Sequence, residues 1–425
     1  MLIPVIFILL NNGAKPKGEL EVELPTVSFP ESVIEFARTP IGDTPTRGQL
    51  ITNITFADVN LDNAIDVIAC DALRGEVYWY ENAGQTQFVK HLMNTESLIP
   101  CPSHVTALDL DRDGDQDFLV TSLGRIQPTN EEVGRLVWLR NDGNEFKQIE
   151  VLSGIRRTTD VQGGDFDSDG DIDLVVAVFG GPLQGEILYL ENDGKQNFTD
   201  YVMLAVSGAI HVPVADFDGD GDLDVVANVT QDDEEVLAFV NDGTGFKKPG
   251  IRKRLYASWN YDLGGAGMIK SDLDQDGDQD LLLSLGDNLE LMHNYPQPWH
   301  GCLYLENKGN WEFSPKQIAN VGGVYGAATA DIDNDGDTDI ALVSMFNDWA
   351  QENSASVVWL ENDGSQNFKT YQIASEPIQL ATVGCADLDQ DGSVEIVTGS
   401  FHFRQPFDRL GSVDIFSRSK GESGE

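Results

Sequence analysis

A nine-residue acidic segment recurs seven times along the chain. The intact copies have aspartate at positions 1, 3, 5, 7 and 9 and glycine at position 6, as in DLDRDGDQD at residues 109–117. Five intact copies begin at residues 109, 165, 216, 272 and 331, and two degraded copies begin at residues 58 and 387. This near-constant spacing predicts a repeat architecture with one acidic segment in each unit.

The carboxylates of these segments are suited to calcium, which prefers about six to eight oxygen ligands in a flexible shell. Side chains at positions 1, 3, 5 and 9 can converge on one point, and the backbone carbonyl at position 7 can add an oxygen. Glycine permits the sharp turn at position 6. A solvated acidic turn would explain one copy, but seven copies in register favour five to seven calcium sites.

An EF-hand is the obvious alternative for such a segment. That loop requires glutamate at position 12 and flanking helices. Position 12 here is Ala69, Val120, Val176, Ala227, Leu283, Leu342 and Thr398. The residues that follow each segment, such as DFLVTS and DLVVAV, are short, apolar and often β-branched, which predicts strands. The EF-hand interpretation is therefore excluded.

The chain carries 71 acidic and 27 basic residues, a formal net charge of -44. A nucleic-acid partner is disfavoured, because no basic stripe exists to displace phosphate counterions. The length of 425 residues would suit two or three ordinary domains, but the repeated units fill residues 50–416 and favour one large closed domain. A hydrophobic content of 41% is ample for its core.

The same strand pattern surrounds each acidic segment. An inner strand precedes the segment, as in HVTALDL, and a second strand follows it. A third strand ends in a tight Asn-x-Gly hairpin, as in ILYLENDG, and an aromatic residue opens a fourth strand. Four antiparallel strands in each of seven units predict an all-β, seven-bladed β-propeller.

The two ends of the chain are expected to close this ring. The last unit stops after its third strand, GSVDIF at residues 411–416. The segment FPESVIEFART at residues 29–39 has the pattern of an outer strand and can complete blade seven. Closure in this way removes the exposed edge of an open sheet.

The acidic segments and the WLENDG-type hairpins resemble the FG-GAP/VCBS repeat family, the calcium-loop propellers also found in integrin α-chains. The resemblance covers almost the whole chain and implies loops between the first and second strands that bind calcium for stability. Members differ in function, so the fold alone does not assign one. The resemblance implies ligands at positions 1, 3, 5, 7 and 9, which are Asp58, Asn60, Asp62, Ala64 and Asp66; Asp109, Asp111, Asp113, Asp115 and Asp117; Asp165, Asp167, Asp169, Asp171 and Asp173; Asp216, Asp218, Asp220, Asp222 and Asp224; Asp272, Asp274, Asp276, Asp278 and Asp280; Asp331, Asp333, Asp335, Asp337 and Asp339; and Asp387, Asp389, Asp391, Ser393 and Glu395.

The first and last segments depart from this pattern. The first has Asn60, Asn63 and Ala64, and the last has Ser393 and Glu395. Each still keeps side chains that carry oxygen at positions 1, 3, 5 and 9. These are the two sites at which the implied calcium is least supported.

The face opposite the acidic loops, here the upper face, is the expected functional surface. The inner strands begin there and the second-to-third loops cross it. The residues five positions before each segment share one register and should ring the mouth of the central channel. They are Asn53, His104, Asp160, His211, Gly267, Gly326 and Thr382.

Long loops bring further candidates to the upper face. Propeller loops that carry aromatic and charged side chains commonly bind ligands. Five of the six histidines map to this face, and His91 is the exception. The loop candidates are Arg125 in blade two, His293, Tyr295, Trp299 and His300 in blade five, Asp348 and Trp349 in blade six, and His402 and Arg404 in blade seven.

Four interpretations of this surface remain open. A binding or adhesion module would hold a carbohydrate or a protein. A polysaccharide lyase would use His104 or His211 as a base beside Tyr295 or Arg404. A transition metal could bind His104, His211 and Asp160. Alternatively, these side chains line a wet channel or pack the loops, as the Trp299 and Trp349 side chains could.

No nucleophile elbow, P-loop or HExxH motif is present. Cys302 and Cys385 fall in predicted strands as small apolar residues. Cys70 and Cys101 should both lie on the upper face, which makes a disulfide between them a hypothesis. We expect a monomer without a membrane span.

The chain begins with ten apolar residues, MLIPVIFILL, too few to span a bilayer as a helix. A short secretory signal is favoured, although its positive n-region is missing. We expect residues 1–24 to form this leader and a linker, residues 25–417 the propeller and residues 418–425 a polar tail. The expected location is extracellular, cell-surface or periplasmic, where calcium is abundant.

Overall fold

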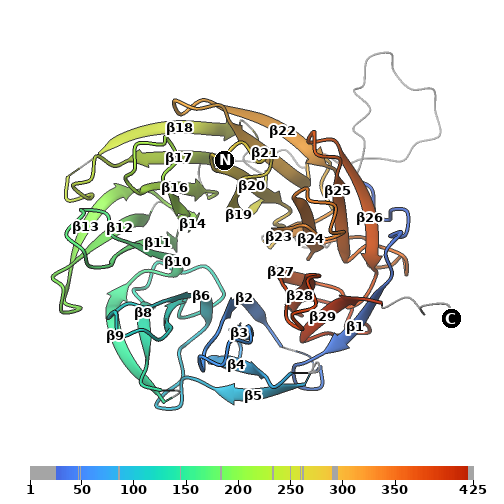
Figure 1. Ribbon diagram of the computed structural model, residues 1–425, viewed down its shortest axis with the longest axis horizontal. Helices are drawn as coiled ribbons and strands as arrows, with labels where there is room; N and C mark the ends of the chain where they lie inside the picture. The colour runs from blue at the N-terminus through green and yellow to red at the C-terminus, as the bar shows by residue number, and fades with distance from the viewer. Residues whose placement is uncertain are drawn as a thin grey trace, which may run out of the picture.

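The chain forms seven four-stranded antiparallel sheets arranged in a ring around a central channel (Figure 1). The structure is a computed structural model, and it describes residues 25–45, 47, 49–84, 87–143, 145–181, 184–231, 234–248, 250–258, 260, 263–289 and 295–419. Every regular element in this part of the chain is a strand. The predicted all-β, seven-bladed propeller is therefore confirmed. The leader at residues 1–24 and the tail beyond residue 419 lie outside the described residues.

Six blades use strands that are consecutive in the sequence, ordered from the channel outward: five of them have four strands, and blade four has five because its inner strand is split. Blade one contains β2 (Ile51–Ala57), β3 (Asp66–Asp71), β4 (Glu76–Asn82) and β5 (Phe88–Leu92). Blade two contains β6 (Pro102–Leu108), β7 (Asp117–Ser122), β8 (Gly134–Asn141) and β9 (Phe146–Ile155). Blade three contains β10 (Thr158–Gly164), β11 (Asp173–Gly181), β12 (Gln184–Asn192) and β13 (Phe198–Ala205).

The inner strand of blade four is split into β14 (Ala209–His211) and β15 (Val214–Ala215), because Pro213 has no N–H to donate to the ladder. Blade four continues with β16 (Asp224–Val229), β17 (Glu234–Val240) and β18 (Ile251–Ser258). Blade five contains β19 (Gly265–Ser271), β20 (Asp280–Leu285), β21 (Gly301–Asn307) and β22 (Phe313–Ala319). Blade six contains β23 (Val324–Ala330), β24 (Asp339–Ser344), β25 (Val357–Asn362) and β26 (Phe368–Ala374).

Blade seven is built from both ends of the chain. Its strands β27 (Leu380–Ala386), β28 (Glu395–Ser400) and β29 (Val413–Arg418) are completed by β1 (Phe36–Pro40). Strand β1 pairs antiparallel with β29, which confirms the predicted closure. The strand is shorter than the predicted segment 29–39, because Glu31 instead forms a parallel bridge with Gln372 of blade six.

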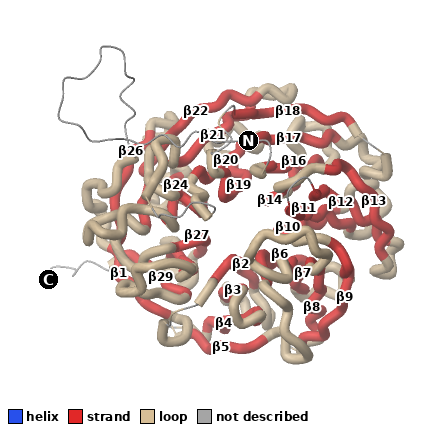
Figure 2. The backbone as a smooth tube through the Cα atoms, turned by 180° about the vertical axis from the view of Figure 1, so that it is seen from behind, coloured by secondary structure: helices blue, strands red, loops and turns tan. Residues whose placement is uncertain are grey.

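The core lies between neighbouring blades. The second strands β3, β7, β16, β20, β24 and β28 are buried at all six of their positions, which explains their continuous apolar runs. Each one packs on both faces. In one cluster, Ile68 and Trp79 of blade one pack with Phe118 and Val120 of blade two. The view from behind shows the same ring of sheets without a helix in the described chain (Figure 2).

Every inner strand contains a register shift, a β-bulge, at the same place. The shift comes immediately before the residue that lies five positions ahead of the acidic loop. The residues after the bulges are Asn53, His104, Asp160, His211, Gly267, Gly326 and Thr382. A bulge redirects the chain around it, so the five of these residues that carry a side chain point it in an equivalent direction.

Candidate functional site

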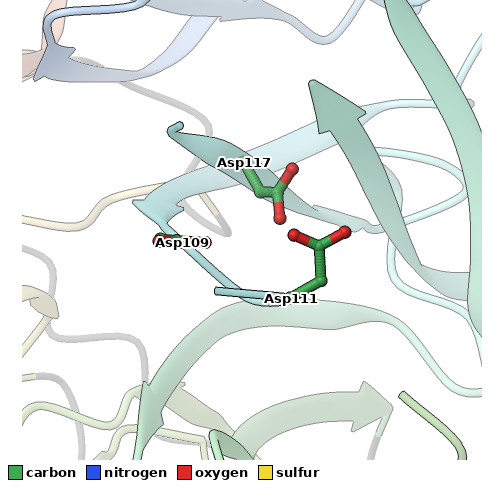
Figure 3. Close-up of side chains that lie close together, drawn as sticks. All are labelled: Asp109, Asp111 and Asp117. Carbon is green, nitrogen blue, oxygen red and sulfur yellow. The ribbon is translucent and has the colours of Figure 1, made fainter. Parts of the chain in front are cut away.

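Each acidic segment forms the loop between the first and second strands of its blade. In blade two, the Asp109 carboxylate accepts hydrogen bonds from the backbone N–H groups of Asp113 and Gly114, both at 3.0 Å. Arg112 at position 4 and Gly114 at position 6 have positive φ angles, 61° and 100°. The chain therefore curls around its own aspartates, and Figure 3 shows Asp111 and Asp117 pointing toward one another.

Carboxylates from each of five loops converge closely enough to share one ion. Within each group the ligand atoms lie within 4.8 Å of one another. The groups combine positions 1 and 3 with position 9 or 5. They are Asp109, Asp111 and Asp117; Asp165, Asp167 and Asp169; Asp216, Asp218 and Asp224; Asp272, Asp274 and Asp276; and Asp331, Asp333 and Asp339.

The loops contain unsatisfied acceptors that fit a hard divalent cation. Nine loop carboxylate oxygens in the described chain are buried and have no hydrogen-bond partner. Such orphaned acceptors are costly unless something positive or an N–H group meets them. They belong to Asp111, Asp115, Asp165, Asp167, Asp171, Asp218, Asp272, Asp274 and Asp278. An all-oxygen donor set of this kind matches the chemistry of calcium.

The aspartate at position 9 links each loop to the rest of its blade. Asp117 accepts the N–H of Leu110 with one oxygen and the N–H of Asn141 with the other. Burial raises the pKa of Asp117 to about 7 against these hydrogen bonds, and the charge of Asp111 adds to the effect. Asp224 and Asp339 have the same arrangement and the same raised pKa, about 7. The loop without a cation therefore holds its negative charges at a cost.

The structure gives the position 7 carboxylate a place that the sequence did not predict. Sequence reasoning assigned the backbone carbonyl of this position to the ion. In blade six, a Cβ on the hairpin glycine Gly364 would lie 2.6 Å from Asp337, so this carboxylate leans against the third-strand hairpin. Asp222 lies against Gly243 in the same way in blade four. The acidic loop and the Asn-x-Gly hairpin thus form one unit.

The hairpin asparagine also joins neighbouring blades. Asn82 donates to the carbonyl of Ile65 in its own loop and to that of Leu388 in the last blade, at 3.1 and 2.7 Å. Asn241 and Asn307 make equivalent paired contacts with their own loop and the preceding one. Sequence reasoning treated this asparagine only as a turn residue.

The first and last loops keep the local fold of the others. Asp58 accepts the N–H groups of Asp62 and Asn63, and Asp387 accepts those of Asp391 and Gly392. Glu395 replaces the aspartate at position 9 and still accepts the N–H of Leu388. The backbone of these two loops is therefore shaped as in the intact copies.

A cavity of about 750 Å³ occupies the mouth and upper part of the central channel. Its polar wall comes from blades one to four, with Asn53, His104, Asp160 and His211. Its other wall, from blades five to seven, contains the rings of Tyr325, Phe401 and Phe403 and the residues Gly267, Gly326 and Thr382, together with the charged side chains of Lys270, Asp287 and Arg404. All seven residues that follow the bulges line it, so the structure brings this predicted ring together.

Asp160 is the centre of the polar wall. It is 2% exposed, with His104 Nδ1 at 3.2 Å and His211 Nδ1 at 3.6 Å from its oxygens. Burial lowers the pKa of His104. Burial alone would raise the pKa of Asp160, but the two imidazoles and the Val212 N–H lower it overall. Asp160 and Asn53 also accept backbone N–H groups of the next blade, so both help to join blades.

His300 and His402 are not in the cavity wall. His300 is fully buried, and its Nδ1 accepts the N–H groups of Gln297 and Gly323. Burial lowers its pKa to about 4. His402 is 2% exposed and accepts the N–H of Gly411, and burial lowers its pKa too. His293 lies outside the described residues.

The predicted loop residues divide in the same way. Arg404 lines the cavity, packs near the rings of Phe346 and Phe403, and donates to the carbonyl of Leu289. Tyr295 is exposed away from it. The remaining four contact neighbouring residues. Trp299 packs against the blade-five core, Trp349 is buried and donates to the carbonyl of Met345, and Arg125 pairs with Glu131. Asp348 accepts hydrogen bonds from Ala350 and Gln351 within its own loop.

Sequence reasoning missed Arg157 as a cavity residue. Its side chain is 7% exposed, lines the cavity and donates to the carbonyl of Ile126 at 2.9 Å. Its Nε is buried without a hydrogen-bond partner, and the guanidinium packs near the Phe179 ring. The available signal was its position three residues before Asp160, at the start of the same inner strand.

The hypothesis of a disulfide between Cys70 and Cys101 is wrong for this structure, in which both are free thiols. Both are buried, and burial raises the pKa of Cys101 to about 12 and that of Cys70 further. Cys302 and Cys385 are also free, and Cys302 is fully buried as predicted for a strand residue. These thiols are therefore poor nucleophiles.

Solved structures with the same fold include BBS1N in complex with ARL6DN, at 10% identity and a TM-score of 0.55, covering 92% of this chain and 98% of that one. Virginiamycin B lyase from Staphylococcus aureus is similar at 12% identity and a TM-score of 0.53, covering 91% of this chain and 100% of that one. At these identities the likeness is one of fold. No curated protein matches the chain.

The described chain contains no helix able to cross a membrane. The FG-GAP-like repeat matches five overlapping segments, at residues 58–120, 109–176, 165–227, 216–283 and 272–342. Each match starts at the first residue of one acidic loop and ends in the second strand of the next blade. The match therefore follows the structural repeat and covers more than half of the chain, which belongs to the FG-GAP-like repeat family.

Proposed function

We propose that this protein is an exported, calcium-stabilised binding module that takes a carbohydrate into the cavity at the channel mouth. The cavity carries this proposal. Its volume of about 750 Å³ falls in the range of small-ligand sites. One wall offers hydrogen-bonding groups and the other offers rings, an arrangement suited to the polar edges and apolar faces of a sugar.

Calcium is assigned a structural role in this proposal. The orphaned carboxylates of four intact loops and the converging carboxylates of the fifth would hold it, and bound calcium would neutralise their charge. The loops lie between the inner and second strands, so fixing them holds the inner strands in register. Those strands in turn place the bulged residues that line the cavity. The ligand site and the cation sites thus occupy opposite faces of one scaffold.

A protein ligand is the alternative within the same class. BBS1N, which shares the fold, is found in complex with ARL6DN. A protein partner would insert a loop into the mouth rather than cover a flat surface. Failure of the protein to retain any polysaccharide would favour this alternative.

A polysaccharide lyase is the second candidate, on one specific observation. His104 lies in the cavity wall beside Asp160, and burial keeps its imidazole neutral at pH 7, the state that can accept a proton. Arg157 and Arg404 line the same cavity and could neutralise a uronate carboxylate. Such an enzyme would create new chain ends.

One incubation series tests the proposal. Calcium-loaded protein is mixed with neutral and uronate-bearing polysaccharides and scored for retention and for new chain ends. We expect retention without new ends, and at least a tenfold weaker retention by His211→Ala, whose imidazole lines the cavity. His91→Ala is the matched control, because His91 lies on outer strand β5 and pairs with Glu81. New chain ends would replace the binding proposal with the lyase.

A further inference from the structure

Three metal-binding side chains meet in the channel wall from three consecutive inner strands. His104 comes from β6, Asp160 from β10 and His211 from β14. Each follows a β-bulge, so one backbone device aims all three. The two imidazole rings lie 6.3 Å apart, nearly perpendicular, with the carboxylate reached by both.

The two distances from the imidazole nitrogens to the Asp160 carboxylate fit ligands around a common ion. His104 Nδ1 lies 3.2 Å from one Asp160 oxygen and His211 Nδ1 lies 3.6 Å from the other. Zinc bonds of about 2.0–2.1 Å at the tetrahedral angle place neighbouring ligand atoms about 3.3 Å apart. A separation of 3.6 Å is too long for a hydrogen bond. The imidazole of His211 therefore lies within ion-pair distance of Asp160 and not in a close hydrogen bond.

The carboxylate is oriented by groups behind it. Gln162 Nε2 donates to one Asp160 oxygen at 3.0 Å, and the Val212 N–H donates to the other at 2.8 Å. A carboxylate oxygen has two lone pairs, so each oxygen keeps one for an ion. Metal sites depend on outer partners of this kind to fix their ligands.

His104 has one further polar neighbour. Thr106 Oγ1 lies 3.3 Å from His104 Nδ1 and donates its own proton to the carbonyl of Val161. The hydroxyl therefore does not donate to His104, so it leaves the lone pair of Nδ1 free to bind an ion.

We propose that His104, Asp160 and His211 bind one divalent transition-metal ion of the zinc class, with its remaining coordination open to the cavity. Two imidazoles and a carboxylate differ from the all-oxygen acidic loops, so the two kinds of site select different ions. The site lies in the wall of the proposed ligand cavity but needs only these three side chains. A nitrogen that binds metal is no longer a base, so this inference competes with the lyase candidate.

The first experiment titrates zinc alone into calcium-saturated protein by calorimetry. We expect one zinc ion per chain. Because metal binding releases protons, the measured heat should change with the ionisation enthalpy of the buffer. His104→Asn and His211→Asn should each weaken zinc binding by at least about 100-fold, because each removes a direct ligand. His91→Asn is the control. His91 also faces a carboxylate, Glu81 at 2.8 Å, and its replacement should leave the titration unchanged.

A second measurement does not depend on the variants folding. Crystals of the wild-type protein grown in calcium and soaked in zinc are examined by anomalous scattering at the zinc edge. A peak among the three side chains supports the site. Three results would overturn the proposal: a titration without one zinc per chain, zinc binding that is unchanged in both histidine variants, or an anomalous peak at another place. Polysaccharide retention with and without zinc separates this outcome from failure of the ligand proposal.

Discussion

Arg157 is a buried cation with few polar contacts. The residue is 7% exposed, its guanidinium donates to the carbonyl of Ile126, and it lines the cavity of a chain with net charge -44. Burial lowers its pKa, which reports the cost of keeping the charge there. A buried charge with so little compensation contributes poorly to stability.

Replacement of Arg157 by methionine should therefore separate stability from binding. We expect the free energy of unfolding of Arg157→Met to be unchanged or raised by roughly 1–2 kcal/mol in chemical denaturation. Retention of uronate-bearing polysaccharide should fall while retention of neutral polysaccharide is kept. Arg156→Met, an exposed neighbour that bonds Gln184, is the matched control. A loss of several kcal/mol at Arg157 would assign it a purely structural role.

At the scale of secondary-structure elements, each acidic loop packs against the third-strand hairpin of its blade. Gly364 and Gly309 close equivalent hairpins in blades six and five, with φ of +71° and +74°. A Cβ on Gly364 would lie 2.6–3.0 Å from the Asp337 carboxylate, whereas a Cβ on Gly309 meets nothing within 4 Å. The two glycines thus share the left-handed backbone conformation, and only Gly364 also lies against a carboxylate.

Alanine at each position distinguishes these effects. Gly309→Ala should cost about 1 kcal/mol for the left-handed conformation alone. Gly364→Ala should cost at least about 1 kcal/mol more and should also weaken calcium binding, because Asp337 must move. Thermal melts with graded calcium measure both. Equal costs for the two variants would show that the carboxylate contact is unimportant.

The repeat explains why elements were predictable and some site residues were not. Counting five residues back from each acidic loop identified the ring from Asn53 to Thr382, because identical blades share one register. The bulge ahead of each member was not visible, since it depends on pairing with β3 and its equivalents. His300 and His402 have ordinary loop sequences. Only the tertiary structure shows that backbone N–H groups donate to the rings of both histidines, which are buried outside the cavity wall.

At the scale of the whole molecule, negative charge is concentrated on one face. Neighbouring acidic loops touch around the ring, since Gln275 donates to the carbonyl of Gly336 and Gln390 to that of Asn63. Burial raises the pKa of Asp117, Asp224 and Asp339 from 3.8 to about 7. A raised carboxyl pKa stabilises the fold below pH 3.8, and this contribution is lost as the pH rises through 7.

Calcium should oppose this pH dependence, because it stabilises the deprotonated loops. With chelator present, these carboxylates should make the melting temperature higher at pH 5 than at pH 8. With millimolar calcium, protons compete with the ion, so the gain from calcium should be larger at pH 8 than at pH 5. Scanning fluorimetry at both pH values gives the comparison. If adding calcium at pH 8 left the melting temperature unchanged, the proposed cation sites would be refuted.

The seam between β1 and β29 determines how the ring responds to mechanical force. The pairing runs from Phe36 opposite Arg418 to Pro40 opposite Asp414, so both chain ends leave the ladder from the same side. A force that separates the two ends first acts on the contacts of residues 29–32 with blade six, such as the bridge between Glu31 and Gln372. It then loads the hydrogen bonds between β1 and β29 one after another, rather than all at once in shear. A protein tethered through both ends would therefore lose these contacts and open blade seven at a low force, while the other six blades remained folded.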